Sequence, residues 1–387
     1  MTTATVNIEP ALAALAAALR GEGPAVELSA GPDGSPVVEL VETPGFEDGA
    51  VVVRTSGSTG APKATVLTVD ALAASSMATA MALEGEGQWL LALPVQYVAG
   101  VQVLVRSLFA GTRPWAMDLS GGFTPEAFTA AALELTDKIR FTSLVPTQLQ
   151  RLLEAPTVET LAALRRFNAI LLGGAPASAK LLAAARDAGV RVVATYGAAE
   201  TCGGCVYDGV PLDGVEVKIS AEGRIMLGGA TIAAGYLGGT DLTAAAFAED
   251  DGVRWYRTND LGELSADGTL TVLGRADDVV ITGGVKVSAA HVQTELERLD
   301  GVRAAFVAGV PSAEWGQALA AYVVLADRSP EAADAFTARL ASGNAGPLAG
   351  ALVPKTVLTA EELLMLPNGK PDRLGMTFRL DARHRGK

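Results

Sequence analysis

The chain has 387 residues, of which 49% are hydrophobic and 19% are charged. Single hydrophobic cores stop growing at about 250–300 residues, so two domains are expected, and this composition excludes a disordered chain. The 30 lysine and arginine residues stand against 43 aspartate and glutamate residues, and the resulting net charge of -13 makes nucleic acid an unfavourable general partner. No apolar run approaches the roughly 18–20 residues that a membrane-spanning helix needs.

The first elements alternate between helix-like and strand-like patterns. An amphipathic helix is expected after Pro10, and because no basic segment precedes its alanine and leucine run, we expect no export signal and a cytoplasmic location. Between residues 50 and 200, short β-branched runs predict buried strands and longer periodic runs predict helices. The strands are expected at Ala50–Val53, Trp89–Leu93, Phe141–Val145, Ala169–Leu172 and Val190–Thr195, and the helices at Val69–Leu83, Val98–Ala110, Thr124–Thr136, Thr147–Glu154 and Ser178–Ala188. This alternation predicts a doubly wound α/β sheet.

The pattern changes twice in the second half of the chain. Short strands between glycine turns predict a β-rich subdomain, with strands at Val215–Ile219, Arg224–Leu227, Trp255–Arg257 and Thr269–Leu273. A small α+β unit is then expected, with helices at Ala290–Leu299 and Pro330–Ala341 and strands at Ala304–Val310, Ala318–Leu325 and Val353–Leu358. The charged, aperiodic segment 274–278 separates the two parts, so we predict domains at 1–274 and 275–387.

Cys202 and Cys205 form a C-x-x-C pair. Structural zinc needs four ligands, and the only histidines, His291 and His384, are distant in the sequence with no second cysteine pair, which disfavours zinc. A redox dithiol remains an alternative. Two small, incidental cysteines beside a glycine-rich turn are the favoured interpretation.

The strongest local pattern follows the strand expected at residues 50–53. It combines two glycines, four hydroxyl side chains and a lysine in Thr55, Ser56, Gly57, Ser58, Thr59, Gly60 and Lys63. Free N–H groups, hydroxyl donors and a cation are the chemistry of a phosphate cradle, although an ordinary turn has the same composition. It is not a Walker A loop, because Pro62 precedes the lysine and Ala64 follows it.

Five segments in order resemble motifs of the adenylate-forming superfamily, which includes acyl- and aryl-CoA synthetases, nonribosomal adenylation domains and luciferases. They are residues 55–63, 196–201, 256–262, 274–278 and 367–373. The resemblance implies a large N-terminal domain that binds ATP and a carboxylic acid, and a small, mobile C-terminal domain. It also implies an acid–thiol ligase, which forms an acyl-adenylate and pyrophosphate and then transfers the acyl group to coenzyme A.

The resemblance also implies a role for several residues. Joining a carboxylate to a phosphate brings two anions together, so cations and N–H donors lower the barrier. Lys370 would bridge the substrate carboxylate and the α-phosphate, with Lys63 as a second cation. Glu200 would carry the Mg²⁺ that accompanies ATP, and Asp260 would bind the ribose hydroxyls. A solvated surface position is the alternative for each of these residues.

Further nucleotide and substrate contacts are implied at Gly173, Gly174, Tyr196, Gly197, Thr201 and Arg275. Tyr196 would offer a flat face to adenine, although an aromatic residue after a strand is commonly part of a core. Two departures from the family pattern matter. Ala199 stands where relatives have a hydroxyl before the glutamate, so Thr201 or Thr59 would have to replace it, and turnover is expected to be slow. Tyr97 stands where many relatives have histidine, and we expect it to act as an aromatic gate.

Residues 93–108 most resemble the o-succinylbenzoate-CoA ligases of menaquinone biosynthesis. Gln102 and Arg106 are four residues apart on an apolar helix, so they share a face, and a guanidinium there needs a polar or anionic partner. The substrate of those ligases carries a second carboxylate, which Arg106 would bind; a structural salt bridge is the alternative. The short segment before residue 55 is also expected of this branch.

The second half-reaction requires coenzyme A. The resemblance makes Asp277 the hinge about which the small domain rotates, so that Lys370 leaves and Gly283 and Gly284 reach the acceptor channel. Lys286 would meet the coenzyme A phosphates, or else be an exposed loop lysine. The alternatives are a ligase for another acid, a nucleotide-binding relative without turnover, and a redox module. The sequence leaves the oligomeric state open, with a homodimer as one option.

Overall fold

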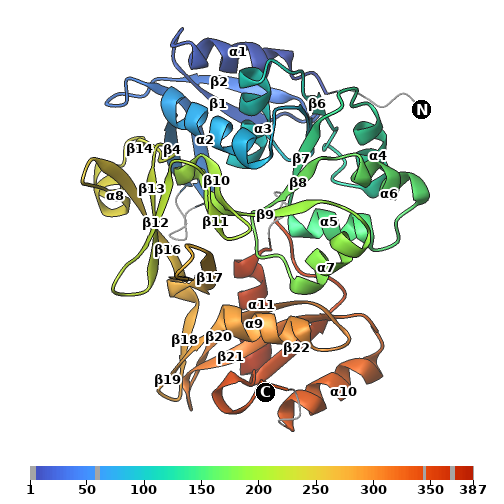
Figure 1. Cartoon of the computed structure of the whole chain (residues 1–387). Helices are drawn as coiled ribbons and strands as arrows, with labels where there is room; N and C mark the ends of the chain where they lie inside the picture. The colour runs from blue at the N-terminus through green and yellow to red at the C-terminus, as the bar shows by residue number, and fades with distance from the viewer. Residues whose placement is uncertain (1–5, 57–61, 343–345, 367–370, 387) are drawn as a thin grey trace. The chain divides into compact units, whose positions relative to one another are not determined.

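The computed structural model describes residues 6–56, 62–342, 346–366 and 371–386. They form two compact units, coloured from blue to yellow and from yellow to red in Figure 1. Unit 1 comprises Met1–Lys218, Met226–Thr258 and Leu264–Leu270, and unit 2 comprises Ile219–Ile225, Asn259–Glu263 and Thr271–Lys387. The domain boundary at 274/275 and the hinge at Asp277 stay predictions. Within the described part of the chain, no helix is both long and apolar enough to cross a membrane.

Unit 1 opens with a helix and a mostly antiparallel sheet. Its elements are α1 (Glu9–Leu19), β1 (Ala25–Ala30), β2 (Pro36–Val41), β3 (Gly49–Ser56), β4 (Pro62–Thr68) and β14 (Gly235–Tyr236), and the strand order is β14-β4-β3-β1-β2. Only the pairing of β1 with β3 is parallel. The expected phosphate segment therefore connects two antiparallel strands, β3 and β4, of which the sequence predicted only the first.

The second sheet of unit 1 is mainly parallel and confirms the α/β prediction. Its strands are β5 (Gln88–Leu91), β6 (Trp115–Ala116), β7 (Arg140–Leu144), β8 (Ala169–Leu172), β9 (Val192–Ala198), β10 (Gly203–Tyr207) and β11 (Val210–Pro211), in the order β11-β10-β9-β8-β7-β5-β6. β10 pairs antiparallel with both β9 and β11. β9 begins at Val192 and ends at Ala198, so it starts two residues and ends three residues later than the expected Val190–Thr195.

Helices cover both faces of this parallel sheet (Figure 1). They are α2 (Val69–Ala82), α3 (Val98–Phe109), α4 (Pro125–Leu133), α5 (Pro146–Leu153), α6 (Val158–Arg165) and α7 (Ala179–Asp187). A buried core that includes Phe128, Leu149 and Ile170 joins one face to α4–α7, and α2 and α3 lie on the other face. Thr68 caps α2 by accepting a hydrogen bond from the Ala71 amide, which explains why that helix begins there.

The β-rich segment forms the expected sheet. Its elements are β12 (Val215–Ile219), β13 (Arg224–Gly229), α8 (Thr240–Ala246), β15 (Phe247–Asp250), β16 (Val253–Leu264) and β17 (Leu270–Arg275), with the strand order β12-β13-β16-β15 and β17 beside β16. Gly223 and Gly268 have φ of 79° and 84° in the two expected turns, a conformation that glycine adopts without steric cost.

The C-terminal part of unit 2 is a five-stranded sheet with helices on both faces. Its elements are β18 (Val279–Thr282), β19 (Val285–Ser288), α9 (Ala289–Arg298), β20 (Val302–Ser312), β21 (Gly316–Leu325), α10 (Pro330–Ala341), β22 (Thr356–Ala360) and α11 (Arg373–Arg385). One core includes Val292 and Leu340, and a second includes Tyr322 and Met376. The last strand starts later than expected, because residues 350–352 form a 3₁₀ turn before it.

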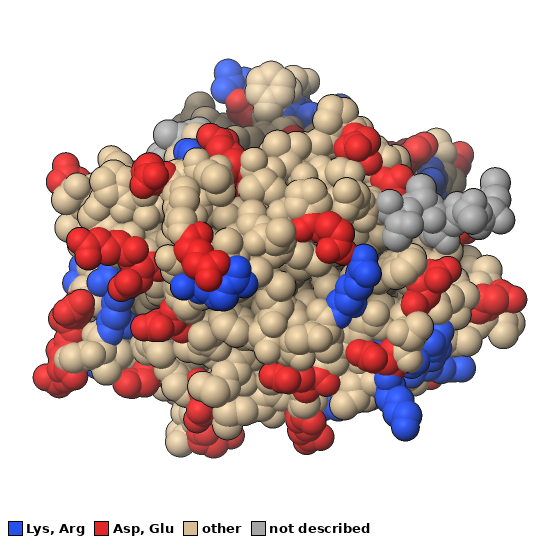
Figure 2. All heavy atoms as spheres, turned by 90° about the horizontal axis from the view of Figure 1, so that it is seen from above, with Lys and Arg blue, Asp and Glu red and all other residues tan. Residues whose placement is uncertain are grey.

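Charged side chains are distributed without a basic patch on the face shown in Figure 2. Carboxylates are spread over that face, and lysine and arginine side chains lie scattered among them. The expectation about nucleic acid, drawn from the net charge, stays a prediction.

Candidate active site

Several expected site residues lie at the carboxyl ends of neighbouring parallel strands. Gly173 and Gly174 follow β8. Tyr196 and Gly197 lie near the end of β9, just before a 3₁₀ turn that contains Glu200. β8 and β9 pair in parallel, so these ends meet at one edge of the sheet. Open α/β sheets bind ligands at this edge.

Two of these glycines are required by packing alone. A Cβ atom at Gly173 would collide with the hydroxyl of Thr195, and one at Gly197 would collide with the carbonyl of Gly203 on the neighbouring strand. The glycines therefore let β8, β9 and β10 approach one another, and this need is independent of any ligand.

Glu200 is the buried carboxylate at this edge, with only 6% of its surface exposed. Its Oε1 accepts a hydrogen bond of 2.7 Å from the hydroxyl of Tyr236. Its backbone carbonyl accepts a hydrogen bond of 2.9 Å from the amide of Ala233, three residues before that tyrosine. The segment before β14 is thereby joined to the 3₁₀ turn through both main chain and side chain.

Lys63 contacts the same tyrosine. Its Nζ lies 4.9 Å from the centroid of the Tyr236 ring, within the range of a cation–π interaction. Lys63 is the second residue of β4, and β14 pairs with β4 so that Tyr236 is opposite Thr65. The structure thus brings Lys63 and Glu200, which are 137 positions apart in the sequence, to one aromatic ring.

Tyr236 was absent from the residues that the sequence indicated. Its pKa is raised, first by burial and then by the neighbouring Glu200 carboxylate and Tyr256. The hydroxyl therefore keeps its proton and remains a donor at neutral pH. The sequence around Tyr236 does not indicate a functional residue, because Glu200 and Lys63, which it contacts, come from other parts of the chain.

The chemistry of Glu200 fits a magnesium ion that arrives with phosphate. Among the described residues, no group of three or more histidine, cysteine, aspartate or glutamate side chains could hold a metal by itself. Mg²⁺ prefers oxygen ligands and is usually bound through one or two carboxylates together with substrate phosphates. A single buried carboxylate that shares the Tyr236 side chain with Lys63 matches that mode of binding.

The Thr201 hydroxyl is hydrogen-bonded to backbone groups, and its expected nucleotide contact stays a prediction. The residue is fully buried, and its hydroxyl accepts a hydrogen bond from the Ala198 amide and donates to the Gly203 carbonyl at 2.7 Å. Ala199, where the family pattern has a hydroxyl, is 4% exposed. Thr59, the other candidate, lies outside the described residues, as do Gly57, Ser58, Gly60 and Lys370. Thr55 is opposite Lys63 in the β3–β4 pair, and Ser56 is opposite Pro62.

Arg106 is buried on α3, with 6% of its surface exposed. Its Cζ lies 5.3 Å from the centroid of the Trp89 ring. In the part of the chain that the structure describes, no carboxylate forms an ion pair with it and its Nε has no hydrogen-bond partner. The structural salt bridge that the sequence allowed is therefore not present among these residues.

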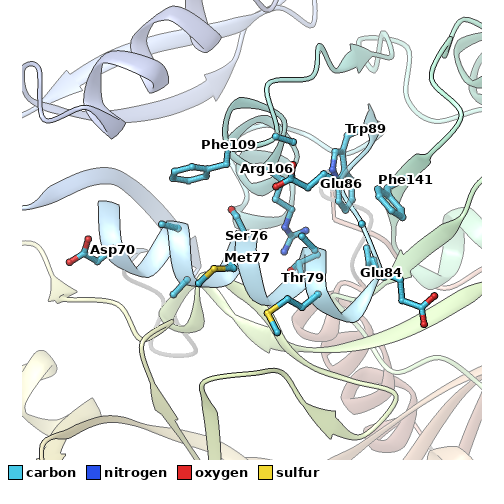
Figure 3. Close-up of a pocket in the computed structure, with 17 residues that line it drawn as sticks. Asp70, Ser76, Met77, Thr79, Glu84, Glu86, Trp89, Arg106, Phe109 and Phe141 are labelled. Atoms are coloured by element: carbon cyan, nitrogen blue, oxygen red, sulfur yellow. The ribbon is translucent and has the colours of Figure 1, made fainter.

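The same arginine lines a cavity of about 790 Å³ beside α2 and α3 (Figure 3). The walls are mainly apolar and include Trp89, Phe109 and Phe141. An unpaired, buried guanidinium in such a cavity can bind an anionic or carbonyl group.

Gln102 lies one turn before Arg106 and is almost fully buried. Its Nε2 donates to the Cys202 carbonyl at 2.5 Å and to the Ser75 hydroxyl at 3.2 Å, while its Oε1 has no partner among the described residues. The amide nitrogen therefore connects α3 to α2 and to Cys202, the residue before β10. Tyr97 is the half-buried N-cap residue of α3, where its backbone carbonyl accepts a hydrogen bond from Gly100.

Unit 2 holds its own charged cluster. Arg275 forms two hydrogen bonds of 2.8 Å with the Asp277 carboxylate, and its Nη1 lies 3.8 Å from Asp260 Oδ1. Hydrogen bonding to Arg275 lowers the pKa of Asp277. Three residues that the resemblance assigned to nucleotide binding and to the hinge are therefore neighbours. Arg373 pairs in turn with Asp278.

Gly283 and Gly284 form the two-residue turn between β18 and β19. Their φ values of 57° and 83° are those of a type I′ turn, which explains both glycines without a ligand. Lys286 is exposed on β19.

The two cysteines are buried and are not joined in a disulfide. Burial raises the pKa of the Cys205 thiol to about 12 and raises that of Cys202 further. The reactive thiolate is therefore disfavoured at neutral pH, which favours incidental cysteines over a redox dithiol.

Two family models match this chain. Residues 15–237 match the AMP-binding enzyme family, and residues 291–370 match the AMP-binding enzyme C-terminal domain. A probable 2-succinylbenzoate–CoA ligase of Mycobacterium tuberculosis is 44% identical over 307 residues, which cover 78% of each chain. A 2-succinylbenzoate–CoA ligase of Listeria monocytogenes is 31% identical over 354 residues, which cover 86% of this chain and 71% of the relative.

Solved structures show the same likeness. The o-succinylbenzoate CoA synthetase (MenE) from Bacillus subtilis in complex with the acyl-adenylate intermediate OSB-AMP matches with a TM-score of 0.70 and 26% identity, over 88% of this chain and 70% of that one. The same enzyme in complex with ATP and magnesium ion matches with a TM-score of 0.67 and 27% identity, over 87% and 72%.

Proposed function

The chain belongs to the AMP-binding enzyme family, and we propose that it is an ATP-dependent ligase that converts 2-succinylbenzoate to its coenzyme A thioester through an acyl-adenylate. The 44% identity to a relative of that name, over 78% of both chains, is the observation that carries the proposal. A buried carboxylate and a lysine that both contact Tyr236 support it, because this is the chemistry that ATP and its metal require.

The first half-reaction uses the residues at the carboxyl edge of the parallel sheet. We assign Glu200 to the magnesium ion, which supplies positive charge to the phosphates of ATP. Lys63 would add a cation beside the phosphate segment. Lys370, by its resemblance to the family lysine, would stabilise the charge that develops as the acid attacks the α-phosphate. Asp260 and Arg275, which are neighbours in unit 2, would bind the ribose.

The acid subsite is assigned to α3. Arg106 is a buried cation without an anionic partner in the described residues, and the Gln102 Oε1 one turn earlier is also unpartnered. An acid with a second, unactivated carboxylate would satisfy the guanidinium, and the apolar wall would pack against an aromatic ring. Tyr97, at the start of the same helix, would close this subsite.

The test is a screen of carboxylic acids for product that depends on both ATP and coenzyme A, with 2-succinylbenzoate first. We expect pyrophosphate release and thioester formation with this acid at a higher kcat/KM than with benzoate or a fatty acid. A higher kcat/KM for another acid would identify a different acid–CoA ligase. Binding of ATP without pyrophosphate release for any acid would identify a nucleotide-binding relative, and the missing hydroxyl at Ala199 would account for it.

Substitution of Lys370 separates the two half-reactions. Lys370→Ala should reduce adenylation by about 10²–10³-fold, the size of loss expected for an oxyanion stabiliser, while preformed acyl-adenylate is still converted to thioester. Rapid-quench measurement of each half-reaction checks this. Equal damage to both steps would contradict the assigned role and the proposed rotation about Asp277.

A further inference from the structure

We propose that Tyr236 is a positioning residue, which holds the metal-binding carboxylate of Glu200 and the phosphate-segment lysine Lys63 in one arrangement. This inference rests on the proposed function, because it assigns the metal to Glu200. It is carried by two contacts of one side chain: the hydroxyl donates to Glu200 Oε1 at 2.7 Å, and the ring lies 4.9 Å from Lys63 Nζ.

The position of the tyrosine ring is itself fixed from several directions. Tyr236 is 2% exposed, and its ring packs against Phe247 with centroids 5.4 Å apart. Its backbone amide donates to Thr243 Oγ1 at 2.9 Å, and the next amide, of Leu237, donates to the Ala64 carbonyl at 2.8 Å. Because the Tyr236 side chain is fixed by these contacts, its hydrogen bond positions the carboxylate of Glu200.

The hydroxyl determines which oxygen of Glu200 is available. Oε1 accepts a hydrogen bond from the tyrosine hydroxyl, and this interaction orients the carboxylate. Mg²⁺ demands near-ideal octahedral geometry, so it gains more than a flexible cation would from a carboxylate that is already oriented. Metal ligands are commonly oriented by hydrogen bonds from outer residues, and loss of such a partner costs about 10–100-fold in metal affinity.

The ring has a different role at Lys63. The negative face of an aromatic ring attracts an ammonium group without neutralising it. Lys63 is therefore restrained beside Tyr236 while its charge stays available to phosphate. A carboxylate in the same place would form an ion pair with the lysine and compete with the substrate.

The substitution Tyr236→Phe removes only the hydroxyl and keeps the ring. Tyr207→Phe is the matched control: Tyr207 is also buried in unit 1, at 6% exposed, and its hydroxyl bonds to Thr79 Oγ1 at 3.0 Å, away from Glu200. Both variants lose one buried hydroxyl, so a general effect on stability should appear in both thermal unfolding midpoints.

The readout is metal binding without turnover. Mn²⁺ is titrated, in the presence of α,β-methylene-ATP, into the wild-type chain and the variants, and free Mn²⁺ is measured by electron paramagnetic resonance. We expect the Mn²⁺ dissociation constant to rise roughly tenfold in Tyr236→Phe and to stay within about twofold in Tyr207→Phe. In turnover, the Mg²⁺ concentration for half-maximal rate should rise, while kcat at saturating Mg²⁺ recovers.

Equal Mn²⁺ affinity in Tyr236→Phe and Tyr207→Phe would overturn the proposal. Glu200→Asp tests it without altering the tyrosine, because the shortened carboxylate can no longer reach the hydroxyl in the same geometry. Wild-type Mn²⁺ affinity in that variant would also count against a positioned carboxylate. The binding assay needs no acid, so a chain that binds Mn²⁺ and nucleotide but activates no acid would contradict the proposed function alone.

Discussion

The charged clusters of the two units are held in opposite ways. Glu200 in unit 1 is buried, and a neutral tyrosine hydroxyl donates to it. Arg275 and Asp277 in unit 2 pair directly, and 37% and 47% of their side-chain surfaces are exposed. A buried charge is costly, so its surroundings must be built to hold it, whereas an exposed pair is screened by water and salt. We therefore expect substitutions around Glu200 to reduce activity more than substitutions in the Arg275–Asp277 pair.

The largest effect is expected from Glu200→Gln. The amide oxygen can still accept the Tyr236 hydrogen bond, so the fold should be retained, but the charge that attracts the metal is lost. We expect adenylation to fall by about 10²–10³-fold. Acid-dependent pyrophosphate release, measured over a range of Mg²⁺ concentrations, checks this.

Glu295→Gln is the matched control for that change. Glu295 is equally buried, at 6% exposed, but it lies on α9 in unit 2 and pairs with Arg298. Its substitution should alter stability and leave the Mg²⁺ dependence unchanged. If the Glu200 variant kept the wild-type rate at low Mg²⁺, the contrast between the two clusters would not hold.

A smaller effect is expected from Arg106→Met, which keeps the apolar stem and removes the buried charge. If this arginine binds the second carboxylate of the acid, KM for 2-succinylbenzoate should rise about tenfold or more, the size expected for hydrogen bonds to a charged group, while KM for ATP stays unchanged. Steady-state kinetics with each substrate varied in turn check this. Arg106→Lys, which keeps the charge, should recover part of the loss. A variant in which both KM values rise equally would point to a structural role.

The smallest effect is expected from Arg275→Ala on stability. The pair with Asp277 is partly exposed, so at most about 1 kcal/mol of unfolding free energy should be lost at pH 7. The pKa of Asp277 is lowered in the folded chain, so the contribution of the pair is present above the ordinary aspartate pKa and is lost as pH falls through the lowered value, below about pH 4.

Denaturant unfolding of the wild-type chain and Arg275→Ala, at pH 7 and pH 3 and at low and high salt, measures this difference. The difference between the two chains should be smaller at pH 3 than at pH 7, and smaller at high salt than at low salt. A stability difference that persisted under both conditions would show that Arg275 contributes through packing and not through its charge.

The sequence predicted the bounds of a helix or strand correctly where neighbouring residues alone determine them. The strand at Ala169–Leu172 and the helix at Pro330–Ala341 were predicted with the bounds that the structure has, because an unbroken apolar run and a Ser329 cap with proline in the first turn specify them locally. The β3–β4 hairpin was only half predicted. Residues 62–68 carry a proline and a lysine, and their strand conformation depends on pairing with β3.

The sequence by itself determined the family and the parallel sheet, and it indicated the charged residues that we propose for ATP chemistry, because these follow from short motifs and periodicity. Tertiary structure alone decided which of those residues meet. It used the Thr201 hydroxyl within the backbone, left Arg106 without a carboxylate among the described residues, and placed Tyr236 between Lys63 and Glu200. The physical reason is that hydrogen bonds and cation–π contacts act over a few ångströms, and only folding brings residues so distant in sequence within that range.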